Sequence, residues 1–188
     1  GDTPLLLACL GGHLDLCKIL MSVPDPASAG GAGKGKAPAA AVKEGGSSSS
    51  SAAADLDKYK NASGVNALAM ACRGGHLSVV QWICAQHSSN SVETCLKESV
   101  DVMGSDALHH AAFSGSVQLV EWLLSASGST LDVKRANNIG AQPLHYAATE
   151  GHVDLCGFLI SKGADASSKT KSGDSVYEMA MQSGHLDL

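Results

Sequence analysis

The stretch GAQPLHYAATEGHVDLCGFLISKG, residues 140–163, predicts two short helices joined by a glycine turn. Pro143 favours the first turn of a helix, where its missing N–H would have no intrahelical partner. Gly151 can adopt the positive φ that ends this helix, and an apolar helix is expected from Val153 to Ile160. Because Gly163 then closes the segment, we interpret the stretch as a helix-turn-helix hairpin.

The hairpin pattern recurs in a single register along the chain. Five copies begin at Gly1, Gly64, Gly104, Gly140 and Gly173, at intervals of 63, 40, 36 and 33 residues. Each copy has an alanine seven positions after its first glycine and a second glycine eleven positions after it, and four of the five place histidine next. Since the extra residues all fall between hairpins, the spacing predicts repeats that stack and bury one another's apolar sides.

These copies resemble the ankyrin repeat, whose pattern is G-x-T-P-L-H-x-A-A-x-x-G-H followed by an apolar helix and G-A-D. The first copy contains Thr3-Pro4-Leu5, and the fourth contains Gln142-Pro143-Leu144-His145 and later Gly163-Ala164-Asp165. The second and fifth copies depart most from the pattern. The resemblance covers nearly the whole chain except residues 25–54. It implies an all-α fold, an ankyrin-type α-solenoid of stacked helix-turn-helix hairpins with β-turn or hairpin connectors.

The register also predicts how the chain is divided. The expected units are repeat 1 at 1–24, a low-complexity insertion at 25–54, repeat 2 with an extended connector at 55–95, repeat 3 at 96–132, repeat 4 at 133–165 and repeat 5 at 166–188. An added turn of helix is expected in the connector, around Val92 to Leu96. Because the chain starts and stops inside repeats that lack a polar outer face, we expect a fragment of a longer protein.

The insertion at 25–54 contains almost no large apolar side chains. Such a composition cannot offset the entropy cost of ordering, so a long disordered loop is expected. Gly30 to Lys36 matches the spacing of a phosphate-binding P-loop. Ala37 replaces the expected hydroxyl and no strand precedes the match, so we interpret it as accidental. Phosphorylation of the run from Ser47 to Ser51 is an alternative in which the loop acts as a switch.

Composition argues against several classes of function. The net charge of −5 and the lack of a basic face argue against a nucleic-acid partner, and no apolar run is long enough for membrane insertion. The cysteines follow the repeat register, as in the pair Cys9 and Cys72, rather than the spacing of a disulfide framework or a zinc site. Buried thiols in a reducing compartment are expected, which favours an intracellular, cytoplasmic protein.

The histidines follow the register as well. Six of the eight occupy two motif positions, after the second glycine or in the first helix: His13, His76, His152, His185, His109 and His145. The resemblance implies a structural role for them, since in this family they bond to neighbouring backbone and turn groups. His110 points away from the adjacent His109, and no acidic pair or nucleophile pattern stands out. No enzyme activity, metal ion or cofactor is expected.

The resemblance implies that function lies on a concave face, where ankyrin repeats bind partners through turn tips and inner helices. The positions that vary in the family flank the first glycine and precede the second. From them we expect a partner-binding surface that consists of Val65, Arg73, Val102, Met103, Phe113, Ile139, Thr149 and Glu150. The five apolar members are expected to lie in water on the bare stack, and a patch of this kind marks an interface.

Two alternatives stay open. Val102 and Met103 could instead pack beneath the extended connector. The expected function is a non-enzymatic scaffold or adaptor that binds a segment of another protein. The alternative function is the regulatory or substrate-recruiting arm of a larger enzyme, such as a ubiquitin ligase or a kinase, whose catalytic domain lies outside residues 1–188.

Overall fold

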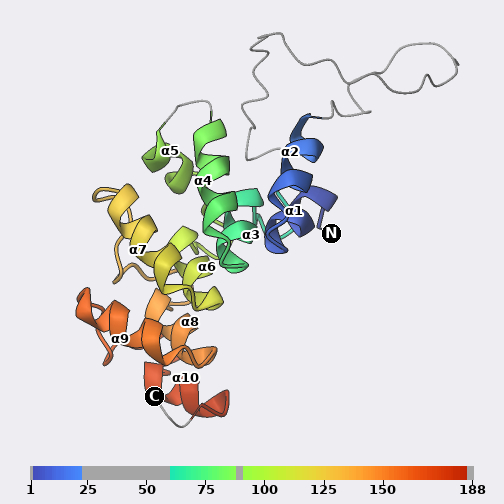
Figure 1. Cartoon of the computed structure of the whole chain (residues 1–188). Helices are drawn as coiled ribbons and strands as arrows, with labels where there is room; N and C mark the ends of the chain where they lie inside the picture. The colour runs from blue at the N-terminus through green and yellow to red at the C-terminus, as the bar shows by residue number, and fades with distance from the viewer. Residues whose placement is uncertain (1, 23–59, 88–90, 186–188) are drawn as a thin grey trace, which may run out of the picture.

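The computed structural model describes residues 2–22, 60–87 and 91–185. These residues form an elongated stack of helical hairpins that runs from α1 and α2 at one end to α10 at the other (Figure 1). The predicted insertion at 25–54, with its P-loop-like match and its serine run, lies outside the described residues.

The described residues form ten helices, nine of which belong to two layers. The inner helix opens each repeat: α1 (Pro4–Leu10), α3 (Ala67–Arg73), α6 (Ala107–Ser114), α8 (Pro143–Thr149) and α10 (Val176–Gln182). The outer helix follows it: α2 (Leu14–Ser22), α4 (Leu77–Gln86), α7 (Val117–Ala126) and α9 (Val153–Ser161). Consecutive inner helices pack on one another, and each outer helix packs on its own inner helix. The predicted all-α solenoid of stacked hairpins is confirmed.

The hairpins start and stop where the sequence supplies caps. Asn66 Oδ1 accepts the Ala69 amide at 2.9 Å at the start of α3, which satisfies an N–H that has no partner within the helix. Pro143 is the first residue of α8, as predicted. Gly151, between α8 and α9, has a φ of 75°, a left-handed conformation in which other residues are strained.

The core between repeats consists of small and medium-sized apolar side chains. The alanines seven positions after the first glycine are almost fully buried, with exposures of 3% for Ala8, 0% for Ala71, Ala111 and Ala147, and 1% for Ala180. They therefore face the neighbouring repeat, as the register predicts. The six cysteines are also buried, as free thiols.

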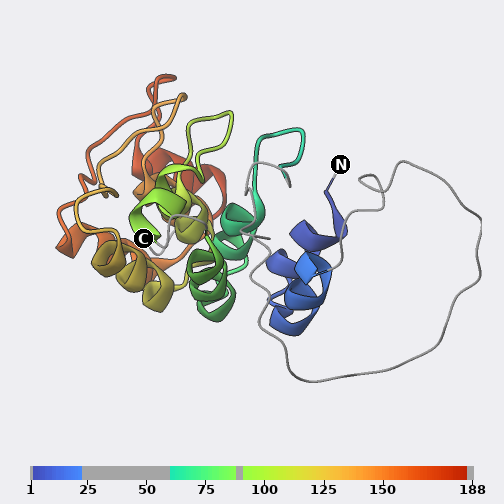
Figure 2. The same ribbon diagram turned by 90° about the horizontal axis from the view of Figure 1, so that it is seen from above.

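The turns before the inner helices share one hydrogen-bond pattern. Asn61, Asp101 and Asn137 lie three residues before a first glycine, and each Oδ1 accepts two amides of its own turn. Adjacent turns are joined by backbone bonds, from Val102 N to Ser63 O at 3.2 Å, from Asn138 N to Met103 O at 2.8 Å and from Lys171 N to Ile139 O at 2.9 Å. The joined turns, residues 61–65, 101–105, 137–141 and 170–174, project from one side of the stack (Figure 2). We name them the turn row.

The extended connector after α4 contains α5 (Val92–Lys97), in agreement with the helical turn predicted there. This helix packs against the outer helix α4 and buries Cys95 and Leu96. Val102 and Met103, by contrast, are 62% and 44% exposed. The alternative in which they pack beneath the connector is therefore wrong, because α5 covers the outer helix and not the turn that holds them.

Two of the histidines that follow the second glycine bond their repeat to the one before it. His76 Nε2 lies 2.9 Å from the carbonyl oxygen of Leu10, and His152 Nε2 lies 3.1 Å from that of Phe113. The imidazole needs the space above the preceding repeat's glycine: a Cβ added at Gly115 would lie 2.6 Å from the His152 ring. The predicted structural role is confirmed for these two histidines.

Candidate binding groove

A groove of about 510 Å³ crosses repeats 1 to 4 between the turn row and the inner helices. The inner helices contribute Leu10, Met70, Arg73, His110, Phe113 and Tyr146 to its lining. The turn side contributes Asp2, Asn61, Val65, Asp101 and Met103. The groove thus combines apolar, aromatic and charged side chains from four consecutive repeats.

Two register positions of the inner helix form the floor of this groove. The position six residues after the first glycine supplies Met70, His110 and Tyr146. The position nine residues after it supplies Leu10, Arg73 and Phe113. Residues three apart lie on the same face of a helix, so each inner helix presents one face to the groove.

Four of the eight predicted binding residues line the groove: Val65, Arg73, Met103 and Phe113. Arg73 and Met103 are exposed and Phe113 is half-buried, so all three side chains are accessible from the groove. Val65 differs, because its side chain is only 6% exposed. The expectation that Val65 lies in water on the bare stack is therefore wrong.

The burial of Val65 follows from how its turn is bonded. Its amide donates to Asn61 Oδ1 at 3.0 Å and its carbonyl accepts the Asn61 amide at 3.1 Å. These bonds direct the residue after the glycine into the stack. Ser105 and Ala141 occupy the same position in the next two repeats and are buried as well. The position is thus part of the interior, although it varies in the family.

The other four predicted residues do not line the groove. Val102 and Ile139 lie on the turn row, with side chains 62% and 44% exposed. Thr149 and Glu150 are half-buried at the end of α8, where Thr149 Oγ1 donates to the His145 carbonyl at 2.8 Å. The structure thus brings half of the predicted set together in one groove.

Arg73 and Phe113 form a cation–π contact in the groove. The guanidinium carbon of Arg73 lies 4.1 Å from the centroid of the Phe113 ring, which belongs to the next repeat. The negative face of the ring attracts the cation, and the C-terminal end of α3 favours positive charge as well. No carboxylate pairs with Arg73 among the described residues. The edge of its guanidinium is therefore available to a partner.

Asp101, on the turn side of the groove, already has its partners within the chain. Its Oδ1 accepts the amides of Met103 and Ser105 at 2.9 and 2.8 Å, and its Oδ2 lies 3.4 Å from His110 Nε2. Burial acts to raise the pKa of Asp101, but the nearby His110 ring and the bonds from the two amides outweigh it and hold the pKa below the usual value. The carboxylate is ionised and internally paired.

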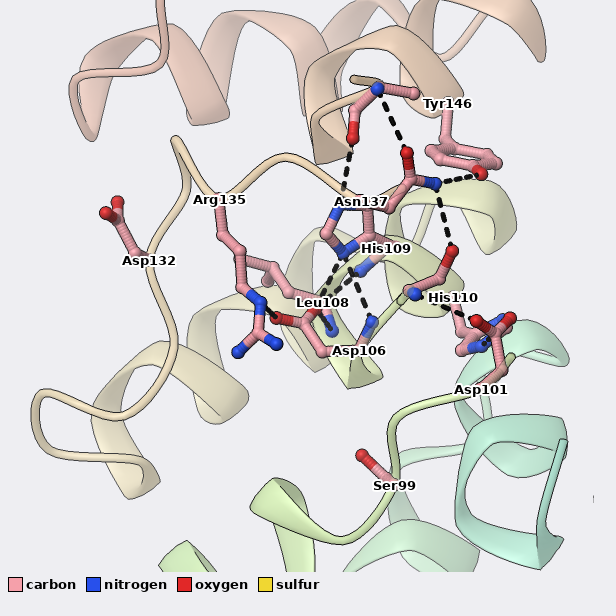
Figure 3. A network of polar contacts seen from close by, with 12 residues as sticks. Ser99, Asp101, Asp106, Leu108, His109, His110, Asp132, Arg135, Asn137 and Tyr146 are labelled. Carbon is pink, nitrogen blue, oxygen red and sulfur yellow. Dashed lines mark hydrogen bonds and ion pairs between the residues drawn. The ribbon is translucent and has the colours of Figure 1, made fainter. Parts of the chain in front are cut away.

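A buried polar network adjoining the groove joins repeat 3 to repeat 4 (Figure 3). Asp106 Oδ1 accepts the amides of Leu108 and His109 at 3.0 and 3.2 Å, which caps α6, and lies 2.8 Å from His109 Nδ1. His109 Nε2 lies 3.1 Å from the carbonyl oxygen of Ala141 in the following turn. The imidazole therefore bridges two repeats.

Asn137 extends the network to Tyr146, which lines the groove (Figure 3). Its Nδ2 donates to Ser105 Oγ at 3.1 Å and to the Tyr146 hydroxyl at 2.9 Å. The Tyr146 ring meets the His109 ring edge-on, with centroids 5.8 Å apart. These contacts fix the position of Tyr146 in the groove floor without a ligand.

Among the described residues, no group of three His, Cys, Asp or Glu side chains is placed to hold a metal ion. None of the helices described is both long enough and apolar enough to cross a membrane. Burial raises the pKa of the Cys156 thiol to about 11 and that of Cys9 further, so few thiolates form at neutral pH.

Two family models match the chain. The model described as ankyrin repeats (3 copies) matches residues 1–135, and the model described as ankyrin repeat matches residues 140–171. The chain belongs to the ankyrin repeat family. No curated protein matches its sequence. Ankyrin repeats are generally protein–protein interaction modules, and the groove of this ankyrin array lies where its inner helices meet its turns.

The family's variable positions identified only part of the ankyrin groove. Met70, His110 and Tyr146 line it and were not among the predicted binding residues. Their position lies three residues before that of Arg73 and Phe113 on the inner helix, so helical spacing alone would have found them.

Proposed function

We propose that this ankyrin array is a non-catalytic scaffold or adaptor that binds a segment of another protein along its groove. The observation that carries the proposal is the groove itself, a hollow of about 510 Å³ lined by side chains from four repeats. Its volume is within the usual range for ligand-binding sites in proteins. A segment that crosses it contacts several repeats at once.

The composition of the groove supports this proposal. Arg, Met and aromatic side chains are enriched in the energetically important centres of protein interfaces, and Arg73, Met103, Phe113 and Tyr146 all line this groove. In this proposal Arg73, Met103 and Phe113 contact the partner directly, whereas the buried Val65 supports the floor. Val102 and Ile139 extend the contact along the turn row, and Thr149 and Glu150 extend it within repeat 4.

Quantitative affinity capture with the full chain tests the proposal. The variant Met103→Asp introduces a charge into the groove at an exposed side chain, so it changes binding with little effect on folding. The matched control Gln118→Asp introduces the same charge at an exposed position on the outer helix α7. We expect partners that are retained by the wild type and the control and lost by Met103→Asp. Partners lost only with the control variant would contradict the proposal.

The alternative function, the arm of a larger enzyme, uses the same groove and differs in what is joined to the array. The reading frame beyond residues 1–188 distinguishes the two. If the same polypeptide contains a catalytic domain, the array is a regulatory or substrate-recruiting arm of an enzyme and not a separate scaffold.

A further inference from the structure

The charges of the groove indicate the chemistry of its partner, an inference that rests on the function proposed above. Arg73 is the one lysine or arginine among the residues that line the groove. It stacks on Phe113 and has no carboxylate partner among the described residues. Stacking restricts the side chain before any partner binds, so little further conformational entropy is lost on binding.

The carboxylates of the groove lie on its turn side and do not neutralise Arg73. Asp101 is paired with His110 and two turn amides. Asp2 precedes the first residue of α1, and its Oδ1 accepts a hydrogen bond from Asn61 Nδ2 at 2.7 Å. Arg73 is the last residue of its inner helix, and a helix of seven residues spans roughly 10 Å. The groove is thus positive at the helix ends and negative at the turns.

Apolar side chains adjoin Arg73 within the same groove. Met103, which is 44% exposed, and the half-buried Phe113 line it above Met70, which is only 6% exposed. Methionine side chains are flexible and polarizable, so they adapt to apolar groups of different shape. A bulky aliphatic or aromatic side chain of a partner would be buried here, next to the guanidinium.

We propose that the groove binds an extended protein segment that carries Asp or Glu beside a bulky apolar residue. The carboxylate pairs with the free edge of the Arg73 guanidinium, whose planar fork matches a carboxylate with two parallel hydrogen bonds. The apolar residue packs against Met103 and Phe113, above the buried Met70. A basic segment fits less well, because Asp101 is already paired and an uncompensated positive charge would lie near Arg73.

A random 12-residue peptide library displayed on phage tests the inference with the full chain as bait. We expect enrichment of peptides in which Asp or Glu is adjacent to Leu, Ile, Met or Phe. A selected peptide, synthesised and measured by fluorescence anisotropy, should lose at least about tenfold in affinity for Arg73→Glu. The same peptide with Lys in place of its acidic residue should recover affinity for Arg73→Glu, which excludes misfolding as the cause.

Lys162→Glu is the matched control. Lys162 also stacks on an aromatic ring, with its Nζ 5.2 Å from the Phe158 centroid, but it is not part of the groove lining. Lys162→Glu changes the net charge by the same amount as Arg73→Glu and should leave the affinity for the peptide unchanged.

The other outcomes separate this inference from the proposed function. Peptides that bind in a Met103-dependent way but lack an acidic residue, or that are basic, overturn the inference and leave groove binding intact. Self-association through the groove, seen by light scattering and abolished by Met103→Asp, overturns it in favour of a second copy as the occupant. Failure to select any peptide whose binding depends on Met103 contradicts both proposals.

Discussion

The guanidinium of Arg73 lies over the ring of Phe113, with 4.1 Å from its central carbon to the ring centroid, and so joins two repeats on the groove floor. Cation–π contacts at accessible sites contribute about 0.5–1 kcal/mol. We expect a double-mutant cycle with Arg73→Ala and Phe113→Ala to give a coupling of this size in the free energy of unfolding, measured by urea denaturation. The longer contact of Lys162 with Phe158 should give a smaller coupling in the same cycle, and equal values would contradict the prediction.

Alanine substitutions at two glycines should change the stability of the array in opposite directions. Gly115 has a φ of 75°, and a Cβ there would lie 2.6 Å from the His152 ring, so Gly115→Ala should destabilise the array by at least about 1–2 kcal/mol. Gly157 lies within α9, and a Cβ there meets nothing within 4 Å. Gly157→Ala should therefore stabilise it by about 0.5–1 kcal/mol, because alanine favours the helix. Thermal unfolding measures the stability of both variants. If both substitutions stabilise the array, or both destabilise it, the assigned backbone conformations are contradicted.

His145 should make the array sensitive to mild acid. Its burial lowers the pKa below the usual 6.5. The unfolded chain then binds a proton at this residue that the folded chain does not, so the free energy of unfolding decreases as the pH falls below 6.5. We expect His145→Gln to remove part of this decrease in urea denaturation at a series of pH values. A pH dependence of the free energy of unfolding that is the same in His145→Gln and in the wild type would contradict this prediction.

The cysteines should be unreactive in the folded protein. All six are buried, and burial raises the pKa of Cys9, Cys17 and Cys156, the last to about 11. Because the thiolate is the reactive form, Ellman's reagent at pH 8 should modify few thiols before unfolding and six in urea. Rapid modification of Cys9 in the native state would show that repeat 1 opens independently of the rest.

The repeat register was sufficient to predict the helices and the packing of the alanines. Ala71 and Ala111 repeat at fixed distances from their glycines, and close stacking of helices leaves no room for larger residues at these positions. Local chemistry also predicted the start of α8 at Pro143. Features that each repeat contains within itself could therefore be predicted from the sequence.

The groove could be predicted only in part, because its geometry depends on contacts between repeats. Val65 was expected at the surface, but the bonds to Asn61 turn it inward, and no spacing rule contains that information. Arg73 and Phe113 are register equivalents in adjacent repeats, so their proximity was predictable. The stacking of one on the other depends on side-chain rotamers that the sequence does not specify.

Adjacent turns in the turn row are held mainly by main-chain atoms, such as Asn138 N with Met103 O. The apolar side chains of Val102, Met103 and Ile139 form none of the hydrogen bonds that align these turns. A library randomised at these three positions should retain its fold in most members. Changes at the tips of the turns can thus adjust which ligands the groove accepts, at little risk to the scaffold that carries them.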